Sequence, residues 1–214
     1  MEESLPIVEC FHSLQGEGKH VGRSAYFIRL AMCKVGCPWC DTKESWIKDN
    51  HPKIKLKQLS INAAKAQSKG AAFVVITGGE PLHHNLNALC SSIREMTIDN
   101  DNQQSIPIHL ETSGVEPLSG NPDWITLSPK PHAPPQSTFL EICHEIKVII
   151  HSKEDLLFAE EMAQKVLKIS SKKVLLYLQP GWGNDEGNFL ASEYVKSHPQ
   201  WRLSIQTHKL LGIR

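Results

Sequence analysis

Strand-like runs alternate with helix-like stretches along most of this chain. Apolar, β-branched or aromatic runs lie at residues 26–32, 72–77, 106–111, 124–127, 146–150, 174–178 and 203–205. Several are continuous enough for strands buried on both faces, which is typical of parallel sheets joined by helical crossovers. A complete eight-fold barrel takes about 250 residues, and this chain has 214. The alternation therefore predicts an α/β fold with a mostly parallel sheet, arranged as a partial (β/α) barrel.

Three helices are expected where apolar residues recur at spacings of three and four. The helix at residues 85–96 should start at Asn85 and bury Leu86, Leu89, Cys90 and Ile93. The helix at residues 153–168 should bury Leu156, Leu157, Ala163 and Leu167. The helix at residues 56–69 should end at Gly70, a residue suited to a left-handed turn. Because no repeat, low-complexity tract or long linker divides the chain, we expect a single domain over residues 1–214.

The charge balance excludes an electrostatic binder of polyanions. The 23 Lys and Arg residues equal the 23 Asp and Glu residues in number, whereas nucleic acids are held largely by summed positive charge. No stretch approaches the roughly 18 apolar residues of a membrane span. The first residues also lack the basic region and apolar core of a secretion signal. We therefore expect a cytoplasmic protein that binds neither nucleic acid nor membrane.

Three of the six cysteines, Cys33, Cys37 and Cys40, lie close together. Their spacing is that of one helical face, but Pro38 has no N–H to donate to the Lys34 carbonyl, and a glycine between them weakens any helix. The segment should therefore be a loop. In a reducing compartment, thiols gathered on a loop indicate metal ligation or redox chemistry rather than a disulfide scaffold.

The residues alone do not decide which metal the cysteines bind. Zinc could be held with a nearby histidine such as His12 or His20, although no second Cys-x2-Cys hook follows. An iron–sulfur cluster held by three thiolates would keep one iron free for a small molecule. The isolated Cys90 and Cys143 are expected to be core residues.

Polar or glycine-rich segments follow the strand-like runs. They are residues 33–40, 77–81, 111–114, 128–130, 151–152, 179–181 and 206–209. The carboxyl ends of parallel strands share one rim of the sheet, which is where such folds bind their ligands. These segments are therefore expected to meet in one site.

Two of the segments resemble the motifs of radical S-adenosylmethionine enzymes. Cys33, Cys37 and Cys40, with Trp39 before the third cysteine, match the three-cysteine motif, and residues 78–81 (Gly-Gly-Glu-Pro) resemble the second motif. In that superfamily a 4Fe-4S cluster binds S-adenosylmethionine at its open iron and generates a 5′-deoxyadenosyl radical. Glycine permits close approach to the backbone, and Glu80 is suited to accept a hydrogen bond from an ammonium group.

Over nearly its whole length the chain is similar to the 7-carboxy-7-deazaguanine synthase family. The resemblance rests on residues 14–18, 29, 37–42, 77–81, 111–114, 128–130, 179–180 and 206–212. It implies a carbon–nitrogen lyase that converts 6-carboxy-5,6,7,8-tetrahydropterin into 7-carboxy-7-deazaguanine with release of ammonia, in queuosine or other 7-deazapurine biosynthesis. The implied reaction abstracts a hydrogen from carbon 6, contracts the ring and returns the hydrogen. The resemblance also implies Mg²⁺, a homodimer and an electron donor such as flavodoxin or ferredoxin.

The resemblance assigns ligands to residues. The cluster would be held by Cys33, Cys37 and Cys40, and magnesium by Thr42. The S-adenosylmethionine site would be lined by Trp39, Gly79, Glu80, Ser113, Ser128, Pro129, Lys130 and Gln179. The pterin would contact Leu14, Gln15, Gly16, Glu17, Arg29, Thr77 and the terminal carboxylate of Arg214. No side chain is assigned as catalytic, since the cofactors generate the radical.

Two other functions stay open at this point. An activase that places a glycyl radical on a partner protein shares the cysteine spacing but predicts no pterin pocket. A zinc-stabilised binding module predicts no catalysis. Six histidines receive no role from the sequence: His83, His84, His132, His144, His151 and His198.

Overall fold

Nine strands of the described chain form one sheet, in the order β3-β1-β2-β4-β5-β6-β7-β8-β9. The computed structural model describes residues 3–99 and 103–214. The strands are β1 (Ser4–Leu14), β2 (Ser24–Leu30), β3 (Lys53–Lys55), β4 (Phe73–Gly78), β5 (Ile108–Thr112), β6 (Trp124–Leu127), β7 (Glu145–Ile150), β8 (Leu175–Pro180) and β9 (Trp201–Leu203). The α-helices are α1 (Leu56–Gln67), α2 (Asn87–Thr97), α3 (Ser137–Ile142), α4 (Lys153–Ile169), α5 (Asp185–Ser197) and α6 (Thr207–Leu211). Short 3₁₀ helices are η1 (Gly18–His20), η2 (Lys43–Trp46), η3 (Lys48–Asn50) and η4 (Pro81–His83).

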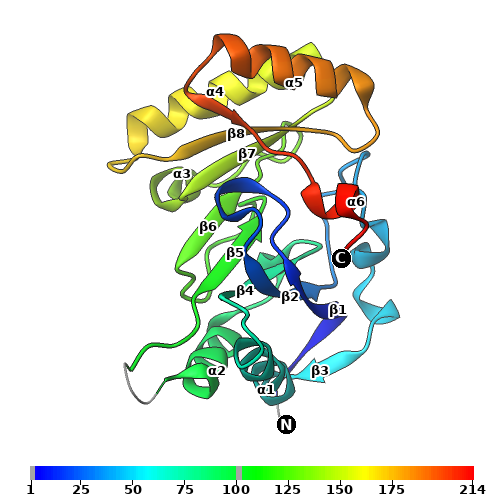
Figure 1. Ribbon diagram of the computed structural model, residues 1–214, viewed down its shortest axis with the longest axis vertical. Helices are drawn as coiled ribbons and strands as arrows, with labels where there is room; N and C mark the ends of the chain where they lie inside the picture. The colour runs from blue at the N-terminus through cyan, green and yellow to red at the C-terminus, as the bar shows by residue number, and fades with distance from the viewer. Residues whose placement is uncertain (1–2, 100–102) are drawn as a thin grey trace.

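The sheet is parallel from β2 to β9, and β1 pairs in the antiparallel sense with both β2 and β3. Its edges, β3 and β9, remain apart, so the predicted partial barrel with a mostly parallel sheet is confirmed. Figure 1 shows α6 and the C-terminus beside β1, across the open side of the sheet. There the backbone N–H of Thr207 donates to the carbonyl of Gly16 at 3.1 Å.

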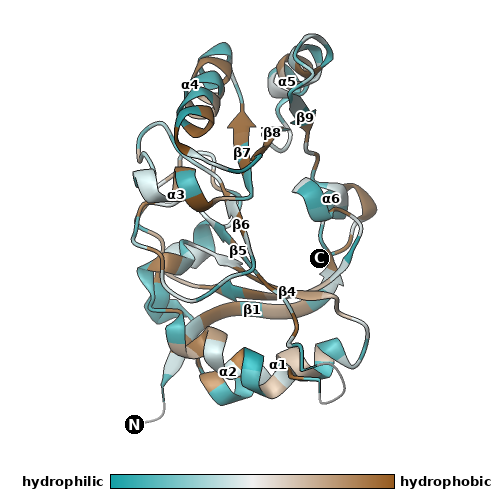
Figure 2. Ribbon diagram, turned by 90° about the vertical axis from the view of Figure 1, so that its left-hand side faces the viewer, coloured by the Kyte–Doolittle hydropathy of each residue, from teal (hydrophilic) through white to brown (hydrophobic). Residues whose placement is uncertain are grey.

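The strands divide their side chains between two environments. On β7, for example, Ile146, Val148 and Ile150 belong to the main hydrophobic core, whereas the alternate residues Glu145 and Lys147 are buried polar groups. Successive strand residues point to opposite faces. Figure 2 shows helices α1, α2, α4 and α5 on the outer side of the curved sheet. The apolar core therefore lies beneath the helices, and the charged side chains point into the barrel.

Several sequence predictions hold at the level of single residues. Helix α2 buries Leu89, Cys90 and Ile93, and Leu86 just before it is also buried, as expected. Asn85 accepts a hydrogen bond from the backbone N–H of Asn87 at 3.0 Å, although the helix itself starts at Asn87, two residues later than predicted. Gly70 has a φ of +97°, which confirms the left-handed turn after α1. Cys90 and Cys143 are both buried in the core.

Other predictions were wrong. In α4, Ala163 is buried and Leu156 packs partly buried against the core, as predicted, but Leu157 and Leu167 are 73% and 77% exposed. The rest of the buried face is made by Ala159, Met162 and Val166. The last strand is Trp201–Leu203 rather than 203–205, since the large side chain that enters the core is Trp201. Elements β1, β3, α3, α5 and α6 were not predicted.

The missed helix α5 has a simple physical explanation. Its buried residues are Gly187 and Ala191, so it shows no stripe of large apolar side chains. At Gly187 a β-carbon would collide with the carbonyl oxygen of Ile150 on β7. Small residues here allow close packing of helix on strand, and hydrophobic periodicity does not register them.

Candidate active site

A cavity of about 600 Å³ opens at the carboxyl ends of the strands, within the range of small-molecule sites. The residues predicted from the sequence line it, with one exception, Pro129. Those on the wall are Leu14, Gln15, Gly16, Glu17, Arg29, Cys33, Cys37, Trp39, Cys40, Thr42, Thr77, Gly79, Glu80, Ser113, Ser128, Lys130, Gln179 and Arg214. The expectation that the strand-end segments meet in one place is therefore met.

The three cysteines lie on an irregular segment after β2, as predicted from Pro38 and the neighbouring glycine. The turn into it is made by Met32, whose φ of +89° is uncommon for a residue with a side chain. All three thiols are half-buried. Burial raises the pKa of Cys33 and of Cys37, so both are protonated near neutral pH until a metal binds.

The donor set of the loop suits a cluster better than a single ion. Among the described residues, no three His, Cys, Asp or Glu side chains converge as the ligands of one ion do. A 4Fe-4S cluster presents a separate iron to each thiolate, so its ligands need not meet at a point. The zinc ligands considered above are wrong, because His12 hydrogen-bonds Ser24 at 2.8 Å and His20 packs against His109, and neither lines the cavity.

Histidines without a predicted role tie the cysteine loop to the barrel. The backbone N–H of Lys34 donates to Nε2 of His83 at 3.0 Å, and Nε2 of His132 donates to the Val35 carbonyl at 3.2 Å. Nε2 of His84 donates to the carbonyl of Ala31, just before the loop, at 2.8 Å. The loop is therefore held in place by side chains of two other loops, at 83–84 and at 132.

The two glycines at the end of β4 are required because the backbone that follows β2 passes very close to them. At Gly78, φ is +140°, and a β-carbon would collide with the backbone of Leu30 on β2. A β-carbon on Gly79 would collide in the same way with the carbonyl of Met32. Neighbouring N–H groups use this proximity: Gly79 N donates to Leu30 O and Glu80 N to Met32 O, both at 2.9 Å. The two glycines thus lock the β4 end against the start of the cysteine loop.

Glu80 is buried and already hydrogen-bonded by the protein. Its Oε1 accepts from Thr112 Oγ1 at 2.6 Å and from Leu82 N at 3.1 Å, and its Oε2 accepts from Ser113 N at 2.8 Å and from Ser113 Oγ. This carboxylate joins the ends of β4 and β5. These four bonds fill the acceptor positions of the carboxylate, so the predicted contact with an ammonium group would have to replace one of them.

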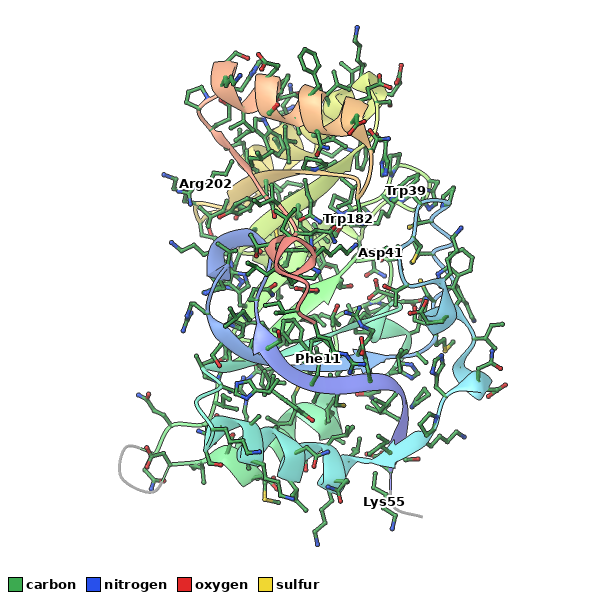
Figure 3. The ribbon with its side chains drawn as sticks, turned by 45° about the vertical axis from the view of Figure 1, so that its right-hand side comes forward. Phe11, Trp39, Asp41, Lys55, Trp182 and Arg202 are labelled. Carbon is green, nitrogen blue, oxygen red and sulfur yellow. The ribbon has the colours of Figure 1, made fainter. Side chains whose placement is uncertain are left out.

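The wall beyond the cysteines carries a buried lysine and an aromatic group. Lys130 Nζ donates to Ser128 O at 2.8 Å and to Ser128 Oγ at 2.7 Å. Burial lowers the pKa of Lys130 to about 8, against the opposing effect of the Cys37 sulfur. Trp39 lies between the rings of His132 and His151, with centroids 5.6 and 5.3 Å away. Figure 3 shows Trp39 near Trp182 and Asp41 on one side of the barrel.

Elsewhere on the cavity wall, Glu17 accepts hydrogen bonds from three side chains. Its Oε1 accepts from Gln179 Nε2 at 3.2 Å and from Gln206 Nε2 at 2.9 Å. Its Oε2 accepts from the ammonium of Lys147, and both side chains of this ion pair are nearly buried. Burial, the largest single effect, would raise the pKa of the Glu17 carboxyl, but the charge and hydrogen bond of Lys147, with the Gln206 hydrogen bond and His208, together lower it. The Lys147 pKa is raised in turn, so the pair is ionised.

A second carboxylate, Glu111, faces the same space. Thr77 Oγ1 donates to Glu111 Oε2 at 2.9 Å, and Gln15 Nε2 donates to Glu111 Oε1 at 3.0 Å. Gln15 Oε1 in turn accepts from the backbone N–H of Glu17 at 3.1 Å. One hydrogen-bonded chain therefore connects the predicted pterin contacts Thr77, Gln15 and Glu17.

Arg29 reaches the cavity from β2. Its Nε donates to Glu9 Oε1 at 3.0 Å, which leaves the two terminal nitrogens free of this bond. Glu9 Oε2 also lies 3.6 Å from Nη1 of Arg214, and Ser13 Oγ donates to the Arg214 carbonyl. Arg214 therefore lies beside β1 and near Arg29, on the wall of the cavity.

Thr42 and its neighbours lie where the cysteine loop meets α6. Thr42 Oγ1 donates to Asp41 Oδ1 at 3.1 Å, and Asp41 Oδ2 accepts from Lys209 Nζ at 2.5 Å. Burial would raise the pKa of Asp41, but the Lys209 ammonium lowers it overall. Lys209 Nζ also lies 5.1 Å from the centre of the Trp182 ring. Two oxygen-bearing side chains are thus available for a hard cation at this corner.

Several wall residues received no role from the sequence: Asp41, Glu111, Lys147, His151, Trp182, Gln206, His208 and Lys209. Glu111, Gln206 and His208 stand inside segments already recognised at strand ends. The signal for Lys147 is a charged residue between two β-branched or aliphatic strand residues, Ile146 and Val148. In a strand whose other face is apolar, such a residue points to the opposite face.

Comparisons with known proteins agree over the whole chain. Residues 14–122 match the family model described as a 4Fe-4S single cluster domain. The 7-carboxy-7-deazaguanine synthase of Prochlorococcus marinus is 60% identical, covering 100% of both chains. The synthase of Synechocystis is 47% identical, covering 99% of this chain and 94% of its own. The crystal structure of QueE from Escherichia coli is similar with a TM-score of 0.77 and 31% identity, covering 95% of this chain and 94% of that one.

These findings decide between the functions left open. A relative of 60% identity over the full length excludes both the glycyl-radical activase and the zinc-stabilised module as the family of this chain. They also indicate the cofactors of the fold, a 4Fe-4S cluster and S-adenosylmethionine. No helix in the described part of the chain combines the length and apolar character that crossing a bilayer requires. The chain belongs to the 7-carboxy-7-deazaguanine synthase family, the radical S-adenosylmethionine enzymes that were expected from its motifs.

Proposed function

We propose that this protein converts 6-carboxy-5,6,7,8-tetrahydropterin into 7-carboxy-7-deazaguanine with loss of ammonia. The observation that carries the proposal is a single cavity whose wall includes the cysteine loop, the carboxylate of Glu17 and the guanidinium of Arg29. The carboxylate of Glu17 suits the N–H donors of an aminopyrimidinone edge, and the guanidinium of Arg29 suits a carboxylate. These are the two polar ends of the pterin acid.

The residues present fit the two cofactors. Three half-buried thiols on one loop would hold the cluster. S-adenosylmethionine would be held by polar groups on the same wall, with Trp39 and the Gly79 backbone: Glu80, Ser113, Ser128, Lys130 and Gln179. Pro129 lies off the wall, and its part would be to shape the Ser128 to Lys130 turn. When bound, these groups supply the adenosyl radical that attacks the substrate.

The remaining work of the chain is binding, orientation and exclusion of water. Glu17, Gln15 and Thr77 would hold the ring, and Leu14 with the Gly16 backbone would cover it from the β1 side. Arg29 would bind the acid end through its guanidinium, and Arg214 beside it would contact the substrate. Holding reactants in one geometry is worth several orders of magnitude in rate, and a dry cavity protects the reactive species.

Magnesium is proposed at Thr42. The Thr42 hydroxyl is a hard oxygen ligand on the cavity wall, and Asp41 beside it adds negative charge. Magnesium usually takes few protein ligands and keeps several waters or substrate oxygens. Thr42, with the charge of Asp41 beside it, would therefore hold the ion, which would supply positive charge that helps to orient the pterin. Turnover with and without added Mg²⁺ after chelation measures this dependence.

The partners and compartment are inferred in the same way. We expect a reducing cytoplasm, which suits the six free thiols of the chain. An external one-electron donor such as flavodoxin or ferredoxin is required by the cofactor chemistry, and a homodimer is implied by the family resemblance. Sedimentation of the protein with its cluster reports the oligomeric state.

The deciding experiment is anaerobic turnover. Protein reconstituted with iron and sulfide is incubated with 6-carboxytetrahydropterin, S-adenosylmethionine, a reductant and Mg²⁺. The proposal expects the deazaguanine product and ammonia in equal amounts, with S-adenosylmethionine regenerated. An Arg29→Gln variant should raise KM for the pterin acid. A cluster-replete sample that binds S-adenosylmethionine but gives no product would refute the substrate assignment.

A further inference from the structure

The ammonium group that binds Glu17 belongs to Lys147, whose side chain points into the interior of the barrel. Lys147 is the third residue of β7, and its inward direction follows from the apolar neighbours on either side, which enter the core. Its side chain is 9% exposed, and that of Glu17 is 13% exposed. A buried lysine is retained only with a partner, because an unpaired charge at such a depth is costly.

The other groups around this pair do not replace the lysine. Glu111 and Glu145 also face Lys147 and add negative charge, while Thr126 and the Lys19 backbone N–H hydrogen-bond Glu145. The nearest further titratable group to Glu17 is His208 of α6, whose pKa is lowered chiefly by burial, so it is neutral near neutral pH. Lys147 is therefore the charged donor that Glu17 depends on.

The three donors on Glu17 are not equivalent. Gln179 and Gln206 approach Oε1 through neutral amides, and the longer of the two bonds is 3.2 Å. A neutral hydrogen bond can be exchanged for one to a ligand at little net cost, since the amide finds another acceptor or water. The Lys147 bond to Oε2 cannot be exchanged in this way, because both partners would be left as buried charges.

We propose that Lys147 is a positioning residue for substrate: it keeps Glu17 ionised and fixes its Oε2, so that the exchangeable side of the carboxylate accepts a heterocycle edge with two neighbouring N–H donors. This inference rests on the proposed function, in which Glu17 meets the aminopyrimidinone edge. A carboxylate held in this state accepts two donors, whereas a protonated carboxyl would present a donor of its own. Lys147 thereby sets the hydrogen-bonding polarity that the pocket recognises.

The test uses binding as well as turnover. Protein with its reconstituted cluster and S-adenosylmethionine is titrated with pterin-6-carboxylate, a fluorescent oxidised analogue that keeps both polar ends and does not react. Wild type, Lys147→Met and Lys147→Arg are compared from about pH 6 to pH 8. Lys165→Met is the matched control, because Lys165 pairs with Glu161 on the exposed surface of α4, far from the cavity.

At pH 6 the Kd of Lys147→Met should exceed that of wild type by about 30-fold or more, as for other buried charge pairs that lose one member. Without Lys147, burial raises the Glu17 pKa against only the Gln206 hydrogen bond and His208, so the Kd ratio should shrink as the pH rises and Glu17 ionises again. Lys147→Arg keeps the charge, and its Kd ratio should not vary with pH. With the reactive pterin, KM should rise in Lys147→Met while kcat changes little. Lys165→Met should match wild type throughout.

A Kd ratio near one at every pH, or a loss that is the same at every pH, overturns the inference. If Lys147→Met does not fold, Glu17→Gln combined with Lys147→Met removes both charges and carries the test. The Kd of the double variant should be no larger than that of Glu17→Gln alone. A further ten-fold rise in Kd would show that Lys147 contacts the ligand itself. If the wild type turns over the substrate and Lys147→Met binds the pterin as tightly as the wild type does, only this inference is contradicted. If the wild-type protein binds no pterin, the proposed function is contradicted as well.

Discussion

The two ends of the barrel interior use the same strands to bury opposite kinds of side chain. At the amino end, the ring of Phe73 stacks on His109 with centroids 4.0 Å apart, and His20 and Trp124 pack around them. At the carboxyl end, Thr77 and Glu111 of the same two strands belong to the hydrogen-bonded chain of the cavity. A few residues along β4 and β5 thus separate a packed plug from a polar site.

The difference lies in how each end treats ionisable groups. At the amino end burial lowers the pKa of His109 to about 3 and that of His20 to about 4, so the histidines pack as neutral rings. At the carboxyl end Glu17 and Lys147 are buried as a pair of charges. Burying neutral aromatic rings stabilises the fold. Burying a pair of opposite charges adds little stability, but it fixes which groups of the site donate and which accept hydrogen bonds. Mutations at the two ends should therefore affect different measurements.

The largest expected effect comes from the cysteine loop. Cys37→Ala removes one of three cluster ligands, so turnover should fall to background while the free energy of unfolding of the cluster-free protein changes by less than about 1 kcal/mol. Iron and sulfide content, visible absorbance and product formation measure it. Cys90→Ala, in the core beneath α2, is the control that should keep the cluster and lose some stability. A Cys37→Ala protein that retained full activity would contradict the cluster assignment.

The opposite result is expected at the amino end. Phe73 is fully buried, so Phe73→Ala should cost about 3–5 kcal/mol of unfolding free energy through lost contacts and a cavity. The KM for the pterin should stay within about two-fold of wild type at a temperature where the variant is folded. Urea unfolding and steady-state kinetics on the same sample measure both. Phe73→Leu should lose less stability in the same assay. A large rise in KM with little loss of stability would break the division between the two ends.

Acid should weaken the amino end before the carboxyl end. Because the folded pKa values of His109 and His20 lie below the ordinary histidine value, the unfolded chain takes up protons first. Stability is therefore complete above about pH 6.5 and falls as the pH drops towards 4, by on the order of 3 kcal/mol. Nε2 of His20 is buried without an acceptor, and Arg23 lies near, so protonation there is disfavoured.

Urea unfolding at several pH values measures this effect, and His109→Phe isolates it. The variant keeps an aromatic ring in the stack but has nothing to titrate, so its stability should depend less on pH than that of wild type. Carboxylates that titrate in both proteins cancel in the difference. Identical pH profiles for the two proteins would show that His109 does not carry the acid sensitivity.

The sequence allowed most of the carboxyl end to be predicted and little of the amino end. Residues such as Cys37, Gly79 and Arg29 belong to short motifs whose chemistry can be recognised in isolation, and the parallel sheet brings their segments to one rim. The stack of Phe73, His109 and Trp124 depends on strand register, because each residue comes from a different strand. Register is a tertiary property that no local pattern in this chain revealed.

The role of Lys147 and the presence of α5 were not predicted from the sequence, for related reasons. The role of Lys147 can be recognised only when its ion pair with Glu17, which is 130 residues earlier in the chain, is known. Helix α5 packs through Gly187 and Ala191, so its fit depends on the strand below it rather than on its own hydrophobicity. In α4 the buried face was predicted only in part, because Leu157 and Leu167 are exposed while Ala159, Met162 and Val166 are buried. Long-range pairing and small-residue packing therefore account for the part that could not be predicted.

The smallest expected effect is at the rim, where Glu9 pairs with Arg29 in partial solvent. Glu9→Gln removes a negative charge beside Arg29 and Arg214 but keeps an oxygen that can accept from Arg29 Nε. The KM for the pterin acid should therefore fall about two- to three-fold at low ionic strength, because exposed pairs are worth at most about 1 kcal/mol. Salt screens exposed charges, so the difference should vanish at high salt, unlike that of Lys147→Met. Glu161→Gln on α4 is the control that should leave KM unchanged. A rise in KM of ten-fold or more would show instead that Glu9 orients Arg29 as strictly as Lys147 is proposed to orient Glu17.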